Sequence, residues 1–217
     1  MKLKSIQKIA TISLFAIAFA FVESSVVVYL RSLYYPGGFV FPLRVMSAEH
    51  LHVELLRECA TIIMLGAVGI LAGTSAWQRF SYFLIAFGVW DFFYYVWLKL
   101  VLNWPASILD WDILFLIPLP WIGPVVAPIL ISALLIVSGV LLLRKEDKNE
   151  KIRAPASVWT MAVLGTCFIL FSFMRDTAAT LNMQRPERYG YDFFCIGMVL
   201  YILALTIMVR TKEAKKH

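Results

Sequence analysis

Residues 9–33 have the sequence IATISLFAIAFAFVESSVVVYLRSL, and this stretch decides the fold. Only two of its residues, Glu23 and Arg31, are charged. A helix needs about 20 mostly apolar residues to cross the hydrocarbon core of a bilayer. The stretch therefore predicts a membrane-spanning helix that carries a carboxylate in its interior.

The composition extends this prediction to the whole chain. Of the 217 residues, 61% are hydrophobic and 16% are charged, whereas soluble domains are about 45–50% apolar and about 25% charged. This excludes an ordinary soluble domain, and it excludes a disordered chain, which needs low hydrophobicity. Apolar segments of spanning length occur at residues 9–33, 51–75, 80–102, 113–143, 158–181 and 191–209. We expect an all-α integral membrane protein, a bundle of six transmembrane helices in one polytopic domain over residues 1–217.

Thirteen of the 20 lysine and arginine residues are grouped in short polar stretches that predict the orientation. They lie at the N-terminus, at Arg79, between Arg144 and Arg153, and at the C-terminus. Six spans place these stretches on one face, which the positive-inside rule assigns to the cytoplasm. We expect a multi-pass protein of the cell inner membrane with both termini in the cytoplasm. This placement accounts for the net charge of +6 without a nucleic-acid partner, which would need a basic face interleaved with aromatic residues.

Prolines mark the segment before the fourth span as irregular. Pro118, Pro120, Pro124 and Pro128 fall within one apolar run, and proline removes a backbone donor and kinks a helix. We expect a kinked or partly re-entrant segment here, before the fourth helix proper. The alternative is an interfacial belt, in which nearby tryptophans anchor the chain at the lipid headgroups. These tryptophans are Trp104, Trp111 and Trp121.

Ionisable residues fall well inside four of the predicted spans. Each costs about 2.5–3.5 kcal/mol at the bilayer centre on insertion scales, so such residues are usually paired or functional. At a rise of about 1.5 Å per residue, all of them lie in the outer half of the membrane. We expect them to meet in one hydrated chamber on the non-cytoplasmic side. They are Glu23, Glu54, Arg57, Glu58, Asp91, Arg175 and Asp176.

The second span has the most specific spacing. His50, Glu54 and Glu58 recur every four residues, which places them on one helix face. Carboxylates and imidazoles from facing helices suit a divalent metal such as Fe, Mn or Zn. Neither Glu54 nor Glu58, however, is followed three residues later by a histidine, as in the Glu-x-x-His pattern of dinuclear bundle sites. The candidate metal ligands are His50, Glu54, Glu58, Glu23 and Asp91, with His52 as an additional one. Two other interpretations stay open, a structural salt-bridge network and a metal-free proton, ion or substrate site.

The charge cluster favours a membrane enzyme, metal-dependent or not, that acts on a lipid-soluble or small polar substrate from the periplasmic or external side. Its candidate catalytic residues are Glu23, Glu58, Asp91, Arg175 and Asp176, and its candidate substrate contacts are Arg57, Tyr94 and Tyr95. The alternatives are a cation- or proton-coupled transporter or channel, and a non-catalytic subunit of a larger membrane complex.

The expected partners are the lipid bilayer and, with it, other membrane-spanning helices. Gly66, Gly69 and Gly73 lie along the second span, and small residues at such spacings let helices approach closely. They predict close packing within the bundle or between two copies of the chain. The other expected partner is a larger membrane complex.

Overall fold

Six long helices form the described part of the molecule, and all six are long and apolar enough to cross a membrane. The computed structural model describes residues 1–39, 44, 46–117, 119–178, 182, 184 and 188–210. The helices are α1 (Leu3–Tyr34), α2 (Ala48–Ala72), α3 (Ala76–Leu102), α4 (Val126–Asp147), α5 (Ala156–Met174) and α7 (Tyr191–Arg210). Two strands, β1 (Trp111–Phe115) and β2 (Trp121–Pro124), connect α3 to α4. The prediction of an all-α bundle with six apolar helices is confirmed.

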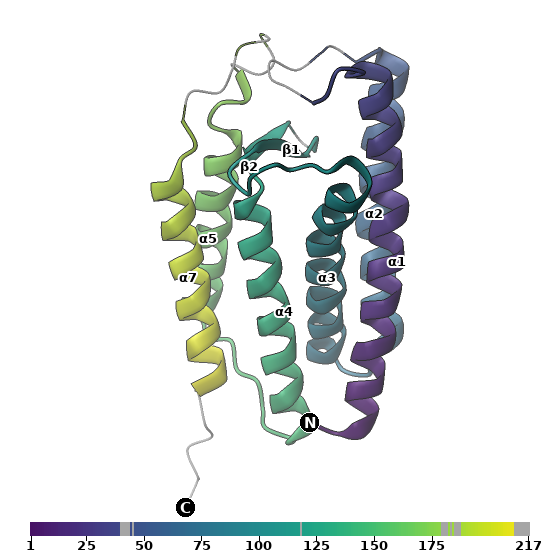
Figure 1. Cartoon of the computed structure of the whole chain (residues 1–217). Coiled ribbons are helices and arrows are strands. Elements are labelled where there is room, and N and C mark those ends of the chain that lie inside the picture. Colours follow the sequence, from purple (N-terminus) through teal and green to yellow (C-terminus); the bar gives the residue numbers. More distant parts are fainter. Residues whose placement is uncertain are drawn as a thin grey trace, which may run out of the picture.

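The central helix is α3, which packs against α1, α2 and α4 (Figure 1). Its contact with α4 is close because each helix presents a glycine to the backbone of the other. A Cβ on Gly88 would lie 2.7 Å from the carbonyl oxygen of Ser132, and a Cβ on Gly139 would lie 2.6 Å from that of Ser81. The pair formed by α5 and α7 joins this assembly through α4 and β2.

Two of the three glycines singled out on α2 are used inside the chain. A Cβ on Gly69 would lie 2.8 Å from the carbonyl oxygen of Arg79, and a Cβ on Gly73 would clash with the backbone of the same residue. These glycines therefore bring the end of α2 against the start of α3. Gly66 has open space around it, so pairing of two copies of the chain stays a prediction for the surface around Gly66.

The segment before α4 is a β-hairpin rather than the start of a helix. The strands β1 and β2 are antiparallel, with Asp112 opposite Gly123 and Ile113 opposite Ile122. α4 begins at Val126, so the span predicted over residues 113–143 begins too early. The re-entrant interpretation requires the hairpin to enter the bilayer, and this stays a prediction.

Proline explains why the apolar run does not continue as one helix. Pro120 and Pro124 have no backbone N–H to donate within a helix, and Pro124 closes β2. Pro128 falls in the first turn of α4, where a missing donor is tolerated. Pro118 lies outside the described residues.

The two ends of the bundle differ. The first turn of α1 and the last turn of α7 lie at one end, and the hairpin lies at the other (Figure 1). The assignment of the first of these ends to the cytoplasm stays a prediction. It rests in part on Lys212, Lys215 and Lys216, which lie outside the described residues. The fifth helix ends at Met174, before its predicted end at residue 181, and residues 179–181 are not among those described.

Candidate functional site

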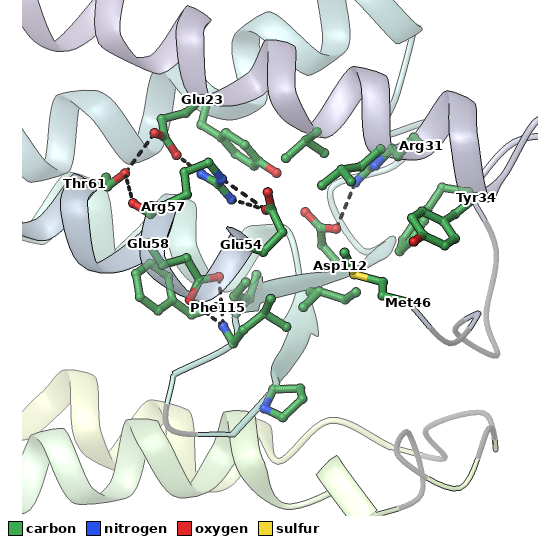
Figure 2. Close-up of a pocket in the computed structure, with 18 of the residues that line it drawn as sticks. Glu23, Arg31, Tyr34, Met46, Glu54, Arg57, Glu58, Thr61, Asp112 and Phe115 are labelled. Atoms are coloured by element: carbon green, nitrogen blue, oxygen red, sulfur yellow. Dashed lines mark hydrogen bonds and ion pairs between the residues drawn. The ribbon is translucent and has the colours of Figure 1, made fainter. Parts of the chain in front are cut away.

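A cavity of about 340 Å³ lies between α1, α2, α3 and the hairpin (Figure 2), at the end of the bundle away from the first turn of α1 and the last turn of α7 (Figure 1). Its size is in the range of small-molecule pockets, about 300–1,000 Å³. The charged residues that line it are Glu23, Arg31, Arg44, Glu54, Arg57, Glu58, Asp91 and Asp112. The structure thus brings Glu23, Glu58 and Asp91, which come from three different helices, to one cavity.

Arg57 connects two of the buried carboxylates (Figure 2). Its Nη1 pairs with Oε2 of Glu23 on α1, and its Nε and Nη2 donate to Oε2 of Glu54 at 3.0 and 2.7 Å. Thr61, one turn farther along α2, donates from Oγ1 to Oε1 of Glu23 at 2.8 Å. These contacts join α1 to α2 and form the kind of internal salt-bridge network that the sequence left open.

A second ion pair joins α1 to the hairpin. Nη2 of Arg31 donates to Oδ1 of Asp112 at 2.9 Å, and both residues are buried. The Arg31 guanidinium also lies over the rings of Trp104 and Phe39, at 3.8 and 4.3 Å from their centres. Burial raises the pKa of the Asp112 carboxyl above its ordinary value, and Arg31 opposes this effect.

Sequence reasoning did not assign Arg31 or Asp112 to the site. Arg31 lies near the end of its span and Asp112 precedes the fourth apolar run, so both fitted the membrane surface. A usable signal was present in the run Asp110-Trp111-Asp112, because carboxylates directly before an apolar, proline-containing segment are unusual. Only the hairpin, however, turns Asp112 back toward α1.

Glu58 and Asp91 have no ion-pair partner among the described residues. Both carboxylate oxygens of Glu58 accept from the backbone N–H of Leu116, at 3.0 and 2.9 Å. Asp91 accepts through Oδ2 from the hydroxyl of Ser132 on α4, at 2.6 Å. Hydrogen bonds to the hairpin and to α4 therefore hold these two carboxylates at the cavity wall.

Tyr94 and Tyr95 also line the cavity. Their rings meet edge to face with centres 5.1 Å apart, and Tyr95 is buried. Together with Trp90 and Phe115 they give the cavity an aromatic wall. The two tyrosines thus lie where a substrate contact would be needed, and their role as such stays a prediction.

The two histidines lie apart from the carboxylates. Both are exposed on the first turns of α2, and neither lines the cavity. His50 Nδ1 is instead 2.6 Å from the hydroxyl of Tyr34. Within the described ranges no three His, Cys, Asp or Glu residues are close enough to hold a metal ion. The expected Fe, Mn or Zn site, with His50 and His52 beside Glu54, therefore has no support in the geometry.

Arg175 and Asp176 are not part of the cavity lining. They follow the last residue of α5, Met174, and α5 packs against α7 and β2 rather than against α1, α2 or α3. Their depth in the membrane, estimated from the sequence, stays a prediction, and depth alone does not fix the position of a helix around the bundle. Their predicted catalytic role has no support from this placement.

Comparisons with protein-family models, curated proteins and solved structures find no match to this chain. Its class therefore follows from its own helices, six of which have the length and apolar composition of membrane spans. The chain is a multi-pass membrane protein. Its activity has to be argued from the cavity.

Proposed function

We propose that this membrane protein is an enzyme that uses Glu58 and Asp91 as an acid–base pair on a small amphipathic substrate bound in the cavity. The observation that carries the proposal is that both carboxylates line the cavity without an ion-pair partner among the described residues. A carboxylate inside a membrane span is costly, and unpaired ones usually mark sites where protons or ligands bind.

A purely structural salt-bridge network explains only part of the cluster. It accounts for Glu23 and Glu54, which pair with Arg57, and for Asp112, which pairs with Arg31. It does not account for Glu58 or Asp91, which are held by neutral donors instead. A general acid or base needs such a position, fixed by hydrogen bonds but free to exchange its proton with a substrate.

The walls of the cavity support an amphipathic substrate. Apolar side chains from all three helices and the hairpin line it beside the carboxylates, including Val27, Leu30, Leu51 and Leu114. Pockets of this kind bind an apolar body through their walls and orient it through a few polar groups. The positive-inside assignment would make the cavity face the periplasm or exterior.

The packing beyond the cavity favours an enzyme over a transporter. Toward the end that holds the first turn of α1 and the last turn of α7 (Figure 1), α1, α2, α3 and α4 meet in an apolar cluster. Its buried members include Ile12, Ala16, Leu65, Ile85 and Leu143. A transporter would need a polar route through this region, whereas an enzyme needs access from one side only.

Reconstitution tests the proposal. The purified chain is placed in liposomes, supplied with extracted lipids and metabolites of the source cells, and the mixture is followed by untargeted mass spectrometry. We expect a product with the native chain and a fall of about 100-fold or more with Asp91→Asn or Glu58→Gln, because general acid–base groups contribute about 10²–10⁴-fold. Glu150→Gln is the control, since Glu150 is exposed and lies outside the cavity.

Two results would contradict the proposal. Equal product with the native chain and Asp91→Asn would remove the acid–base role. An ion or proton flux across the liposomes that Asp91→Asn abolishes, with no product formed, would assign the cavity to transport. Activity of the purified chain alone would separate it from a non-catalytic subunit.

A further inference from the structure

The charged residues of the cavity are arranged in two layers. The outer layer, near the hairpin end of α1, holds Arg31 and Arg44 with one carboxylate, Asp112. The inner layer holds four carboxylates with one arginine. Glu23, Arg57 and Glu54 are joined by ion pairs, Glu58 follows Glu54 by one turn of α2, and Asp91 lies about 16 Å before the end of α3. Arg31 follows Glu23 by eight positions on the same helix, which separates them by about 12 Å along its axis. The cavity therefore has an excess of positive charge outside and of negative charge inside.

Arg31 offers an unused donor in the outer layer. Its Nη1 is buried and has no hydrogen-bond partner among the described residues, while the residue itself is only 7% exposed. The rings of Trp104 and Phe39 and the hydrogen bond to Asp112 hold the guanidinium in one orientation. A fixed guanidinium with a free N–H matches the oxygen atoms of a carboxylate or phosphate.

The inner layer offers unused acceptors. The Oδ1 atom of Asp91 accepts no hydrogen bond from the part of the chain that the structure describes, since Ser132 donates to Oδ2. Glu58 makes no ion pair within 4.0 Å there, and its neighbour Arg57, whose charge it feels, is bonded to Glu23 and Glu54. Trp90 and Tyr94 line the same region, and aromatic faces attract an ammonium group. This part of the cavity is therefore suited to a protonated amine.

We propose that the ligand of the cavity is a zwitterion, with its amine between Asp91 and Glu58 and its carboxylate or phosphate at Arg31. This inference rests on the proposed function and names the substrate class of the same site. Two sources share this chemistry, the headgroup of an aminophospholipid and a free amino acid or aminoalkyl phosphate.

Binding of defined probes to the detergent-purified chain tests the inference. Dihexanoyl-phosphatidylethanolamine and free O-phosphoethanolamine carry both charges, dihexanoyl-phosphatidylglycerol carries only the phosphate, and hexylamine carries only the amine. We expect one of the zwitterions to bind with a Kd at least tenfold lower than either single-charge probe. Binding of the short-chain lipid alone assigns a lipid source, and binding of O-phosphoethanolamine assigns a free metabolite.

Variants test the predicted orientation of the ligand. Asp91→Asn should weaken the zwitterion and hexylamine by tenfold or more and leave phosphatidylglycerol unchanged. Arg31→Gln should weaken the zwitterion and phosphatidylglycerol by tenfold or more and leave hexylamine unchanged. Because Arg31→Gln also leaves Asp112 without its partner, Arg44→Gln is a second outer-layer variant, and Arg44 is exposed.

Several outcomes would overturn the inference. They are binding of a single-charge probe as tight as that of both zwitterions, equal weakening of all probes by Asp91→Asn, and absence of binding by any probe. None of these affects the acid–base proposal, which depends on product formation in the reconstitution assay. Loss of product formation with retained zwitterion binding would instead leave a binding site without catalysis.

Discussion

At the scale of single residues, Arg57 has the largest electrostatic role. Its single positive charge is shared between Glu23 from α1 and Glu54 from its own helix, and both carboxylates are buried. A buried carboxylate that loses its partner keeps the cost of its desolvation without the compensating attraction. The stability of the bundle should therefore depend on this side chain more than on any exposed charge.

We predict that Arg57→Gln lowers the free energy of unfolding by about 3 kcal/mol, because removing one partner of a buried ion pair typically costs about 3–5 kcal/mol. Reversible unfolding in mixed micelles measures the change. Lys148→Gln is the matched control: the Lys148–Glu150 pair is exposed, with Nζ and Oε1 4.0 Å apart, and such pairs contribute about 0–1 kcal/mol. Equal losses in the two variants would show that Arg57 is not buried in a low-dielectric network.

The residues of the site were predictable to the extent that they are charged and lie within apolar runs. This criterion found Glu23, Glu54, Arg57, Glu58 and Asp91, all of which line the cavity. It could not find the partners supplied by uncharged or distant groups. The N–H of Leu116 and the hydroxyl of Ser132 have no charge or periodic pattern that would mark them.

At the scale of secondary-structure elements, helix packing depends on where glycines fall. Gly88 and Gly139 let α3 and α4 meet with backbones in contact. The six apolar helices were predictable because apolar length is a strong signal, but the start of α4 and the end of α5 were not. The hairpin was not, because its short apolar strands continue without a polar break into α4, and such runs cannot be told from a helix by periodicity.

We predict that Gly139→Ala destabilises the bundle by about 1–3 kcal/mol, the usual cost of adding atoms to a tightly packed interior. The new Cβ would lie 2.6 Å from the carbonyl oxygen of Ser81, a backbone atom that can move only with its helix. Gly66→Ala is the control, since nothing lies within 4 Å of its Cβ position. It should be neutral or stabilising by up to about 1 kcal/mol, because alanine is the better helix former. Unfolding midpoints of the two variants are compared in the same detergent. A lower midpoint for Gly66→Ala than for Gly139→Ala would contradict the prediction.

At the scale of the whole molecule, the cavity lies at the hairpin end of the bundle, opposite the first turn of α1 and the last turn of α7 (Figure 1). The orientation in the membrane thus determines which compartment supplies the substrate. The positive-inside rule predicts the cytoplasm for the two ends of the chain, and labelling from one side of the membrane tests this orientation.

We predict that a cysteine introduced at Leu109 reacts with a membrane-impermeant maleimide added to intact cells, and that one at Glu150 reacts only after the membrane is permeabilised. Both positions are exposed and lie in connections at opposite ends of the bundle. The background is a chain whose own Cys59, Cys167 and Cys195 are replaced by alanine. The reverse labelling pattern would show the opposite orientation in the membrane, with the cavity open to the cytoplasm.

The hairpin has a consequence for biosynthesis. It supplies Asp112 to Arg31 and the Leu116 N–H to Glu58, yet it leaves the ribosome after α1, α2 and α3 have been made. Until the hairpin emerges, the three helices must enter the lipid while Arg31 and Glu58 still lack the hydrogen-bond partners that the hairpin supplies. A nascent chain long enough to expose α1, α2 and α3 but not the hairpin should therefore be held by the insertion machinery, and one long enough for the hairpin to emerge from the ribosome should be released.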